Sequence, residues 1–360
     1  MNKILSILKE ENFDILPGEL LTLGYEHFNE YKDSDIHPAE EPFERPKLLK
    51  NKKKVDEVVN NLPTILRYFL DGSRKTYKIA DVILDGHYLP LIAGQIGVAV
   101  LKRLDNKQGF KPLKDYCNFE NIIAFPSRIN KDDLKYLKDK IMKELKIEFN
   151  LIQYDIKKDR DPVDLGIAQI NKCMQDLEVE KVVNMSEKKL LHNNAILILD
   201  GPVRFKKMQG RQFDIVQFRN VIGVSKTFKP SFSIGKGKEK KDVGAITSRL
   251  EFGERTSVYK THDDDRIIGQ WYLRIRPRRA MASPLQGIIK MECFATSPEE
   301  IENGFETDRI DTISSFLLQE RNVTPFKSDH RWASHFYPIY LAEKYIKSSF
   351  LGDTRFKALF

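Results

Sequence analysis

Cysteine and long hydrophobic runs are what this sequence has least of. Its 360 residues include three cysteines, Cys117, Cys173 and Cys293, which lie far apart. This spacing excludes a disulfide framework and the paired pattern of a zinc site. No apolar run approaches the ~20 residues that are needed to span a bilayer. The sequence therefore predicts a protein of the reducing cytoplasm with no membrane segment.

A P-loop for nucleotide binding is also missing. The stretch "GKGKEKK" (235–241) is rich in glycine and lysine but lacks the Gly-x4-Gly-Lys-Ser/Thr pattern. Any step driven by ATP hydrolysis must therefore come from another protein. The stretch instead predicts a basic loop that contacts phosphates without reading sequence, through Lys236, Lys238, Lys240 and Lys241.

Positive charge is in moderate excess. Sixty lysines and arginines against 52 acidic residues give a formal charge of +8, which suits a polyanionic partner but does not prove one. Basic residues cluster at 50–54, 233–241 and 274–279. Arg276, Arg278 and Arg279 follow a predicted strand and are, with the basic loop, the expected nucleic-acid contacts. Trp271 and Tyr272 of that strand could stack on bases, although such residues are more often core.

The order of predicted elements indicates a mixed α/β fold. Hydrophobic residues make up 41% and charged residues 31%, as in globular proteins. Residues 1–60 are expected to form a helical, polar docking segment, and residues 61–360 the main domain. Strands are predicted at 65–70, 79–84, 91–101, 148–155, 195–200, 213–226, 269–277 and 287–294. Helices are predicted at 130–146, 161–189, 306–322 and 337–350. This order favours one central sheet with helices around it.

Two predicted strands end on an aspartate followed by glycine. Most Asp-Gly pairs are simple turns, and Asp85-Gly86 fits that reading because it joins two strands as a hairpin. Asp71 and Asp200 have no obvious hairpin partner after them. In α/β sheets, chemistry is found at the carboxyl ends of strands. A carboxylate there needs a partner, for which a metal ion is one candidate, because an unpaired buried charge is costly.

Five stretches carry a family resemblance: "FLDGSR" (69–74), "LILDGPV" (197–203), "VIGVSK" (221–226), "WYLRIR" (271–276) and "YPIYLAEKY" (337–345). They occur in the order expected of a NurA-type nuclease domain, which the chain resembles from about residue 62 to 350. The resemblance implies an RNase H-like central sheet flanked by helices and a DNA nuclease that depends on Mn2+ or Mg2+. It also implies a homodimer that acts with a HerA-type hexameric ATPase in DNA end processing or phage defence.

The resemblance also assigns roles to residues. Asp71 and Asp200 match two metal-binding aspartates of the family, as two-metal hydrolysis requires converging carboxylates. A further acid is expected on the helix before the second Asp-Gly. Glu178 and Glu180 flank the apolar stripe of that helix on opposite sides, so periodicity does not choose between them. Glu180 is favoured, because its distance from the strand is more like that of the family.

Two further residues complete the implied site. Lys226 matches a family lysine near the active centre, where an ammonium can contact the scissile phosphate. The family usually carries Asp or His in the helix after its Tyr-Pro. Here Glu343 is the nearby acid but lies out of register, and His335 precedes the helix. This departure leaves the last metal ligand open.

Other interpretations stay open beside the nuclease. The chain could be a nuclease-fold subunit that has lost catalysis and serves as a DNA-binding or adaptor module of the same complex. An Argonaute-like protein that acts on RNA would need guide-binding domains for which 360 residues leave little room. The acidic stretch "HDDD" (262–265) is expected to be a solvated loop, because consecutive acids on a regular element point in different directions.

Overall fold

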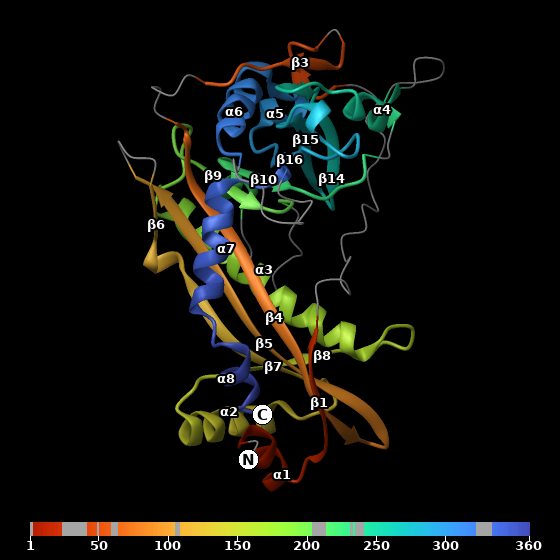
Figure 1. Cartoon of the computed structure of the whole chain (residues 1–360), viewed down its shortest axis with the longest axis vertical. Helices are drawn as coiled ribbons and strands as arrows, with labels where there is room; N and C mark the ends of the chain where they lie inside the picture. The colour runs from red at the N-terminus through yellow and green to blue at the C-terminus, as the bar shows by residue number, and fades with distance from the viewer. Residues whose placement is uncertain are drawn as a thin grey trace.

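A large mixed sheet forms the centre of the protein (Figure 1). The computed structural model describes residues 3–23, 42–48, 50–58, 64–104, 109–203, 214–230, 233–234, 241–321 and 333–360. Within these residues the main path of the sheet follows the order β3 (Lys52–Lys54), β13 (Glu254–Thr256), β15 (Arg266–Arg274), β16 (Ile288–Phe294), β10 (Val221–Ser225), β9 (Ile196–Asp200), β4 (Leu66–Leu84), β5 (His87–Arg103), β7 (Asn118–Pro126) and β8 (Asn150–Tyr154). Off this path, β1 (Asp14–Leu23) pairs with β4, β14 (Tyr259–Asp263) with β15, and β6 (Phe110–Pro112) with β5. The predicted mixed α/β class is therefore confirmed.

The longest strands form one hairpin, β4 and β5, which runs along the length of the molecule in Figure 1. Its turn is Asp85-Gly86, with φ of 48° and 74°. Both residues thus adopt the left-handed conformation of a type I′ turn, which matches the twist of the two strands. The predicted hairpin is confirmed at this turn. The predicted strand end at Asp71 is wrong, because β4 continues through it and Asp71 pairs with Ala99 of β5.

Helices cover both faces of this hairpin. A Cβ on Gly94 of β5 would meet Ile170 of α3 (Pro162–Glu187), whereas one on Gly97 would meet Ile346 of α7 (Tyr337–Ser349). Residues three apart on a strand point to opposite faces, so α3 and α7 lie on opposite sides of the sheet. The remaining helices are α1 (Lys3–Glu10), α2 (Lys131–Leu145), α4 (Val243–Ser248), α5 (Pro298–Asn303), α6 (Thr307–Gln319) and α8 (Asp353–Lys357).

The four predicted helices are confirmed as α2, α3, α6 and α7. Asn130 caps α2 by accepting a hydrogen bond from the Asp132 amide at 3.0 Å, as expected from the sequence. Pro338 lies in the first turn of α7, where proline costs no helical hydrogen bond. The strand expected over 213–226 is shorter. Residues Ile215–Phe218 form a 3₁₀ turn, and only Val221–Ser225 are extended.

The N-terminal segment differs from the helical extension that the sequence predicts. Among the described residues of this segment, only Lys3–Glu10 are helical, and Asp14–Leu23 form β1, which is antiparallel to β4. Residues 24–41 lie outside the described part of the chain. Helix α1 lies near α8 and the C-terminus (Figure 1). Its apolar side is buried among aromatic residues from that end of the chain. Its members are Ile4, Leu5, Ile7 and Leu8, packed with Phe356 and Phe360. The α1 part of the expected docking segment is therefore a part of the core.

Leu8→Ala is expected to lower the free energy of unfolding by about 2–5 kcal/mol, because it removes a fully buried side chain. Lys9→Ala, at the exposed next position, should change it by less than about 0.5 kcal/mol. Denaturant unfolding of both variants checks this. Equal stability of the two would mean that α1 does not pack on its own chain.

Candidate active site

Asp71 and Asp200 lie side by side on neighbouring parallel strands. Leu70 of β4 pairs with Leu199 of β9, and the next residue on each strand is the aspartate. Strand β9 ends at Asp200, and β1 begins to pair with β4 only at Thr76. Among the described residues, this edge of β4 therefore has no strand partner between Asp71 and Thr76. The two aspartates lie at the start of this gap in the sheet.

The side chains of the two aspartates point to the face that α7 covers. Phe69 and Ile198, two positions before them, belong to the core cluster that includes Ile339 of α7. Alternation along a strand places Asp71 and Asp200 on the same face as these residues. Lys226 follows β10 on this face, and its Nζ donates a hydrogen bond to Asp200 Oδ2 at 2.7 Å. The sequence thus predicted correctly that these three residues converge.

The helix carboxylate at this site is Glu178, not Glu180. Glu178 is 8% exposed, and its Oε1 lies 2.2 Å from the place where a Cβ on Gly72 would be. Glu178 therefore lies against the bare backbone beside Asp71, on the α3 side of the sheet. Glu180 instead accepts hydrogen bonds from Lys181 at 3.2 Å and Asn184 at 3.4 Å. The sequence preference for Glu180 is corrected by this packing.

Negative charge in this cluster is only partly compensated. Burial, and then the nearby carboxylate of Asp200, raise the pKa of Asp71 well above its ordinary value. Burial and Asp200 likewise raise the pKa of Glu178 to about 8. Although burial alone would lower the pKa of Lys226, the carboxylates of Asp200 and Asp71 raise it. The site is therefore short of positive charge, and a cation would relieve the repulsion between its carboxylates.

Glu343 of α7 lies at the border of the cluster. It interacts electrostatically with Asp71, Lys226 and His335. Burial alone would raise the pKa of Glu343, but the hydrogen bond and charge of Lys347 one turn later, together with the charges of Lys226 and His335, lower it on balance. Glu343 is thus near enough to influence the aspartates, while its carboxylate is already engaged by a lysine of its own helix.

The donor set of the cluster suits a hard divalent cation. Asp71, Glu178, Asp200 and Glu343 offer carboxylate oxygens, the ligands that Mg2+ and Mn2+ prefer. A bound cation would favour the ionised forms of Asp71 and Glu178, which burial and the carboxylate of Asp200 disfavour. Within the described residues, however, no three His, Cys, Asp or Glu side chains are close enough to hold an ion as they stand. The residues therefore fit a metal in kind, and binding would require the carboxylates to move closer together.

The basic residues expected to contact nucleic acid have mixed outcomes. Arg276 is buried and donates to the Ala333 carbonyl at 3.4 Å, and burial, followed by Arg321, lowers its pKa to about 10. It is therefore not a surface contact. Arg278 and Arg279 are exposed in a 3₁₀ turn. Lys241 is exposed in β12 (Lys241–Asp242), whereas Lys236, Lys238 and Lys240 lie outside the described residues.

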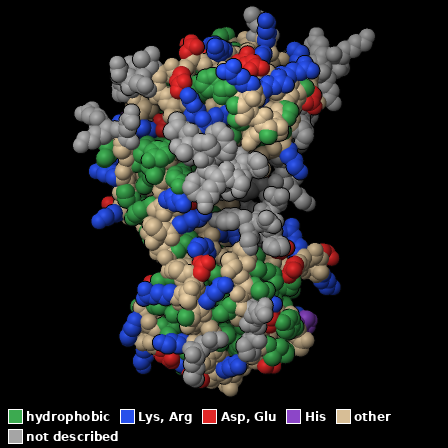
Figure 2. Space-filling view, viewed as in Figure 1, with side chains coloured by type: hydrophobic (Ala, Val, Ile, Leu, Met, Phe, Trp, Pro, Cys, Tyr) green, Lys and Arg blue, Asp and Glu red, His purple; other side chains and the backbone are tan. Residues whose placement is uncertain are grey.

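Other expected features have plain structural roles. Trp271 and Tyr272 are fully buried in β15, so they are core residues and not a stacking surface. The "HDDD" stretch is the end of β14 and its turn to β15. Lys and Arg side chains are spread over the face in Figure 2, with a denser group near its top, where β3 lies. Two lysines of β3 are neutralised by ion pairs, Lys52 with Glu254 at 2.7 Å and Lys53 with Asp311.

Comparison with models of known protein families finds no match to this chain, and comparison with curated proteins finds no significant one. Over the described part of the chain, no helix has the length and apolar character needed to cross a membrane.

Proposed function

We propose that this protein is a metal-dependent deoxyribonuclease of NurA type. One observation carries the proposal: Asp71 and Asp200, more than a hundred residues apart in the chain, lie side by side where β9 ends. Lys226 and Glu178 join them at the same gap in the sheet. Converging carboxylates beside an ammonium are the groups that metal-assisted phosphodiester hydrolysis needs.

The resemblance and the geometry together suggest a role for each residue. Asp71, Asp200 and Glu178 would hold Mn2+ or Mg2+, which when bound supplies an activated water and stabilises the leaving oxygen. Lys226 would contact a non-bridging oxygen of the scissile phosphate with its ammonium. Its present hydrogen bond to Asp200 keeps the ammonium over the carboxylates. Glu343 would serve as a further ligand only after release from Lys347.

An RNase H-like arrangement of the sheet is part of the proposal. The strands β7, β5, β4, β9 and β10 are consecutive neighbours in the sheet. Strand β4 is antiparallel to β5 and parallel to β9. This order supports the proposal because it brings the first aspartate strand next to a central strand that ends on the second aspartate. A homodimer, a HerA-type hexameric ATPase as partner, and a role in DNA end processing or phage defence rest on the sequence resemblance alone.

A second candidate function has its own supporting observation. Within the described residues no three acidic or other ligating side chains form a ready metal group, and Glu343 is engaged by Lys347. Both facts suit a nuclease-fold subunit that binds DNA, or adapts a partner to it, without cleaving. Catalysis is favoured over the adaptor function, because burying the carboxyl groups of Asp71 and Glu178 lowers the stability of the fold, and a subunit without a metal site would have no use for them.

The test is incubation of the purified full-length chain with labelled single- and double-stranded DNA in Mn2+, Mg2+ or EDTA. Cleavage that needs a divalent ion is the expected result. Binding of DNA without cleavage in either metal would favour the adaptor. A protein that neither binds nor cleaves DNA would refute both functions.

A further inference from the structure

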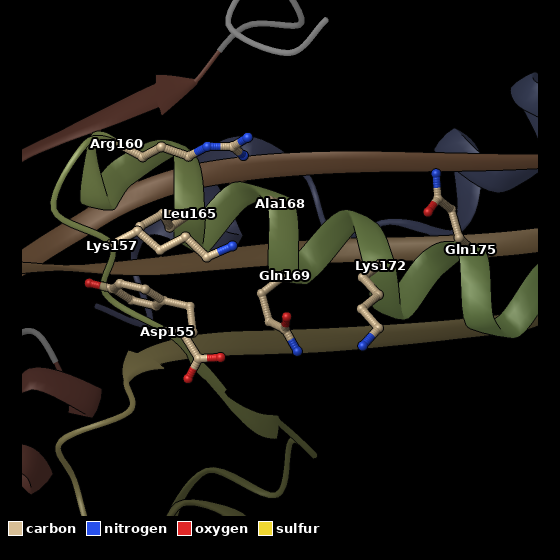
Figure 3. A pocket seen from close by; sticks show the side chains of 9 residues that line it. Asp155, Lys157, Arg160, Leu165, Ala168, Gln169, Lys172 and Gln175 are labelled. Carbon is tan, nitrogen blue, oxygen red and sulfur yellow. The ribbon is translucent and has the colours of Figure 1, made fainter. Parts of the chain in front are cut away.

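A cavity of about 280 Å³ lies beside the first half of α3, at the sheet edge formed by β8 (Figure 3). Side chains from the loop after β8 and from α3 line it. Three of them are cationic, Lys157, Arg160 and Lys172, against a single lining carboxylate, Asp155. These residues are dispersed among acidic neighbours in the chain, so they form no basic cluster in the sequence.

The other lining groups are mainly polar. Gln169 and Gln175 of α3 contribute amides, which can both donate and accept hydrogen bonds. Figure 3 shows Lys157 lying along α3, with Gln169 and Lys172 following one another on the helix. The aromatic residue of the lining, Tyr154, is buried and donates from its hydroxyl to the Pro90 carbonyl at 2.7 Å. The cavity therefore offers charge and hydrogen bonds but no exposed ring on which a base could stack.

Nearby carboxylates reduce this positive charge only in part. Asp161 is engaged as the N-cap of α3, where it accepts from the Val163 amide at 2.8 Å. Lys172 interacts with Asp176 on its own helix. Lys157 is exposed, so its charge faces an incoming ligand.

The position of the cavity relative to the carboxylate cluster suggests its ligand. Both lie along one helix: Lys172 precedes Glu178 by six residues, or about 9 Å of helix rise, and Gln175 precedes it by less than one turn. The stripe that includes Ile170 packs on the sheet, whereas Lys172 and Gln175 face the cavity. A polyanion held in the cavity would therefore extend along the α3 side of the sheet, toward Gln175 and the half of the helix that carries Glu178.

We propose that this groove binds the phosphodiester backbone of a single polynucleotide strand on the α3 side of the sheet. The inference rests on the proposed function for the choice of a polynucleotide as ligand. Cations and amides without an exposed ring fit phosphates and sugars rather than bases, so binding in the groove is independent of base identity. This contribution to affinity is electrostatic and falls as salt rises.

The test compares two double variants of the full-length protein for binding of a labelled oligothymidylate in EDTA. Lys157→Glu with Lys172→Glu reverses two charges of the groove. Lys135→Glu with Lys158→Glu makes the same net change at exposed positions that do not line the groove. The groove variant is expected to lose about tenfold in affinity and about 1.4 in log–log salt slope, for two lost phosphate contacts on a single strand. The control variant should lose much less.

Equal losses of affinity in the two variants would overturn the proposed groove, because the change in net charge alone would then explain them. A wild-type protein that does not bind the oligothymidylate would also overturn it. The outcome for the nuclease is separate. If the wild-type protein cleaves DNA and the groove variant binds the oligothymidylate as tightly as the wild type, the groove alone is refuted. Groove-dependent binding without cleavage in any metal refutes the nuclease alone. Circular dichroism and thermal unfolding check the fold, and Lys157→Gln with Lys172→Gln replaces the reversal if that variant misfolds.

Discussion

Asp71→Asn and Asp200→Asn are each expected to abolish metal-dependent DNA cleavage while the fold stays intact. Each change keeps the size of the side chain and removes the charge of one of the two carboxylates that lie side by side on β4 and β9. A loss of at least about 100-fold is expected, the size of effect seen when one charge-stabilising group is removed from other hydrolases. The measurement is the initial cleavage rate in Mn2+, together with circular dichroism of each variant.

Helix α3 supplies a matched pair for the same experiment. Glu178→Gln should lose activity as the aspartate variants do, because Glu178 lies against Gly72 at the site. Glu180→Gln, two residues later, should keep activity, since Glu180 is paired with Lys181 and Asn184. Wild-type rates in both aspartate variants would exclude the proposed site. Loss of activity in Glu180→Gln alone would restore the choice made from the sequence.

The elements with strong local signals could be predicted from the sequence. Asn130 before an apolar stripe marks the start of α2, and Asp85-Gly86 marks the hairpin turn, because each residue type suits that backbone position. The convergence of Asp71 and Asp200 was implied by the resemblance, because an RNase H-like sheet places the first strand beside a central one. The argument from strand ends holds for Asp200 but not for Asp71, where β4 continues. These signals are local or depend only on strand order, so one sequence is enough to carry them.

The N-terminal segment shows what local signals miss. The stripe of α1 indicates a buried face but does not say which surface covers it. Its partners, such as Phe356, lie at the other end of the chain. Likewise, Asp14–Leu23 form a strand because β4 offers a free edge, which is a tertiary effect that overrides weak propensity.

The choice between Glu178 and Glu180 failed for a related reason. Helix α3 contacts the sheet and neighbouring loops on several sides, so both glutamates flank its apolar stripe. The signal that decides between them lies in another element. The strand predicted to end at Asp71 leaves Gly72 outside it, whereas a glycine inside a strand marks a close approach by a neighbouring group. The carboxylate of Glu178 occupies the space that any other side chain at position 72 would fill.

Gly72→Ala is therefore expected to damage both the site and the fold. Its Cβ would lie 2.2 Å from Glu178 Oε1 and 3.2 Å from Met174 Cγ. Glu178 would have to leave its place beside Asp71, so cleavage should fall about as far as in Glu178→Gln. Overpacking of this kind typically lowers the free energy of unfolding by about 1–3 kcal/mol. Denaturant unfolding and cleavage rates in Mn2+ measure the two effects.

The double variant Gly72→Ala with Glu178→Ala separates the clash from other causes. If the carboxylate is what the new methyl group meets, removing it should recover most of the stability that Gly72→Ala loses, and the two changes should be coupled by about 0.5–3 kcal/mol. Gly352→Ala is the control, because a Cβ there would meet nothing within 4 Å and its φ of −58° suits alanine. A Gly72→Ala protein with wild-type stability and activity would show that Glu178 does not approach this strand, and would reopen the choice of helix carboxylate.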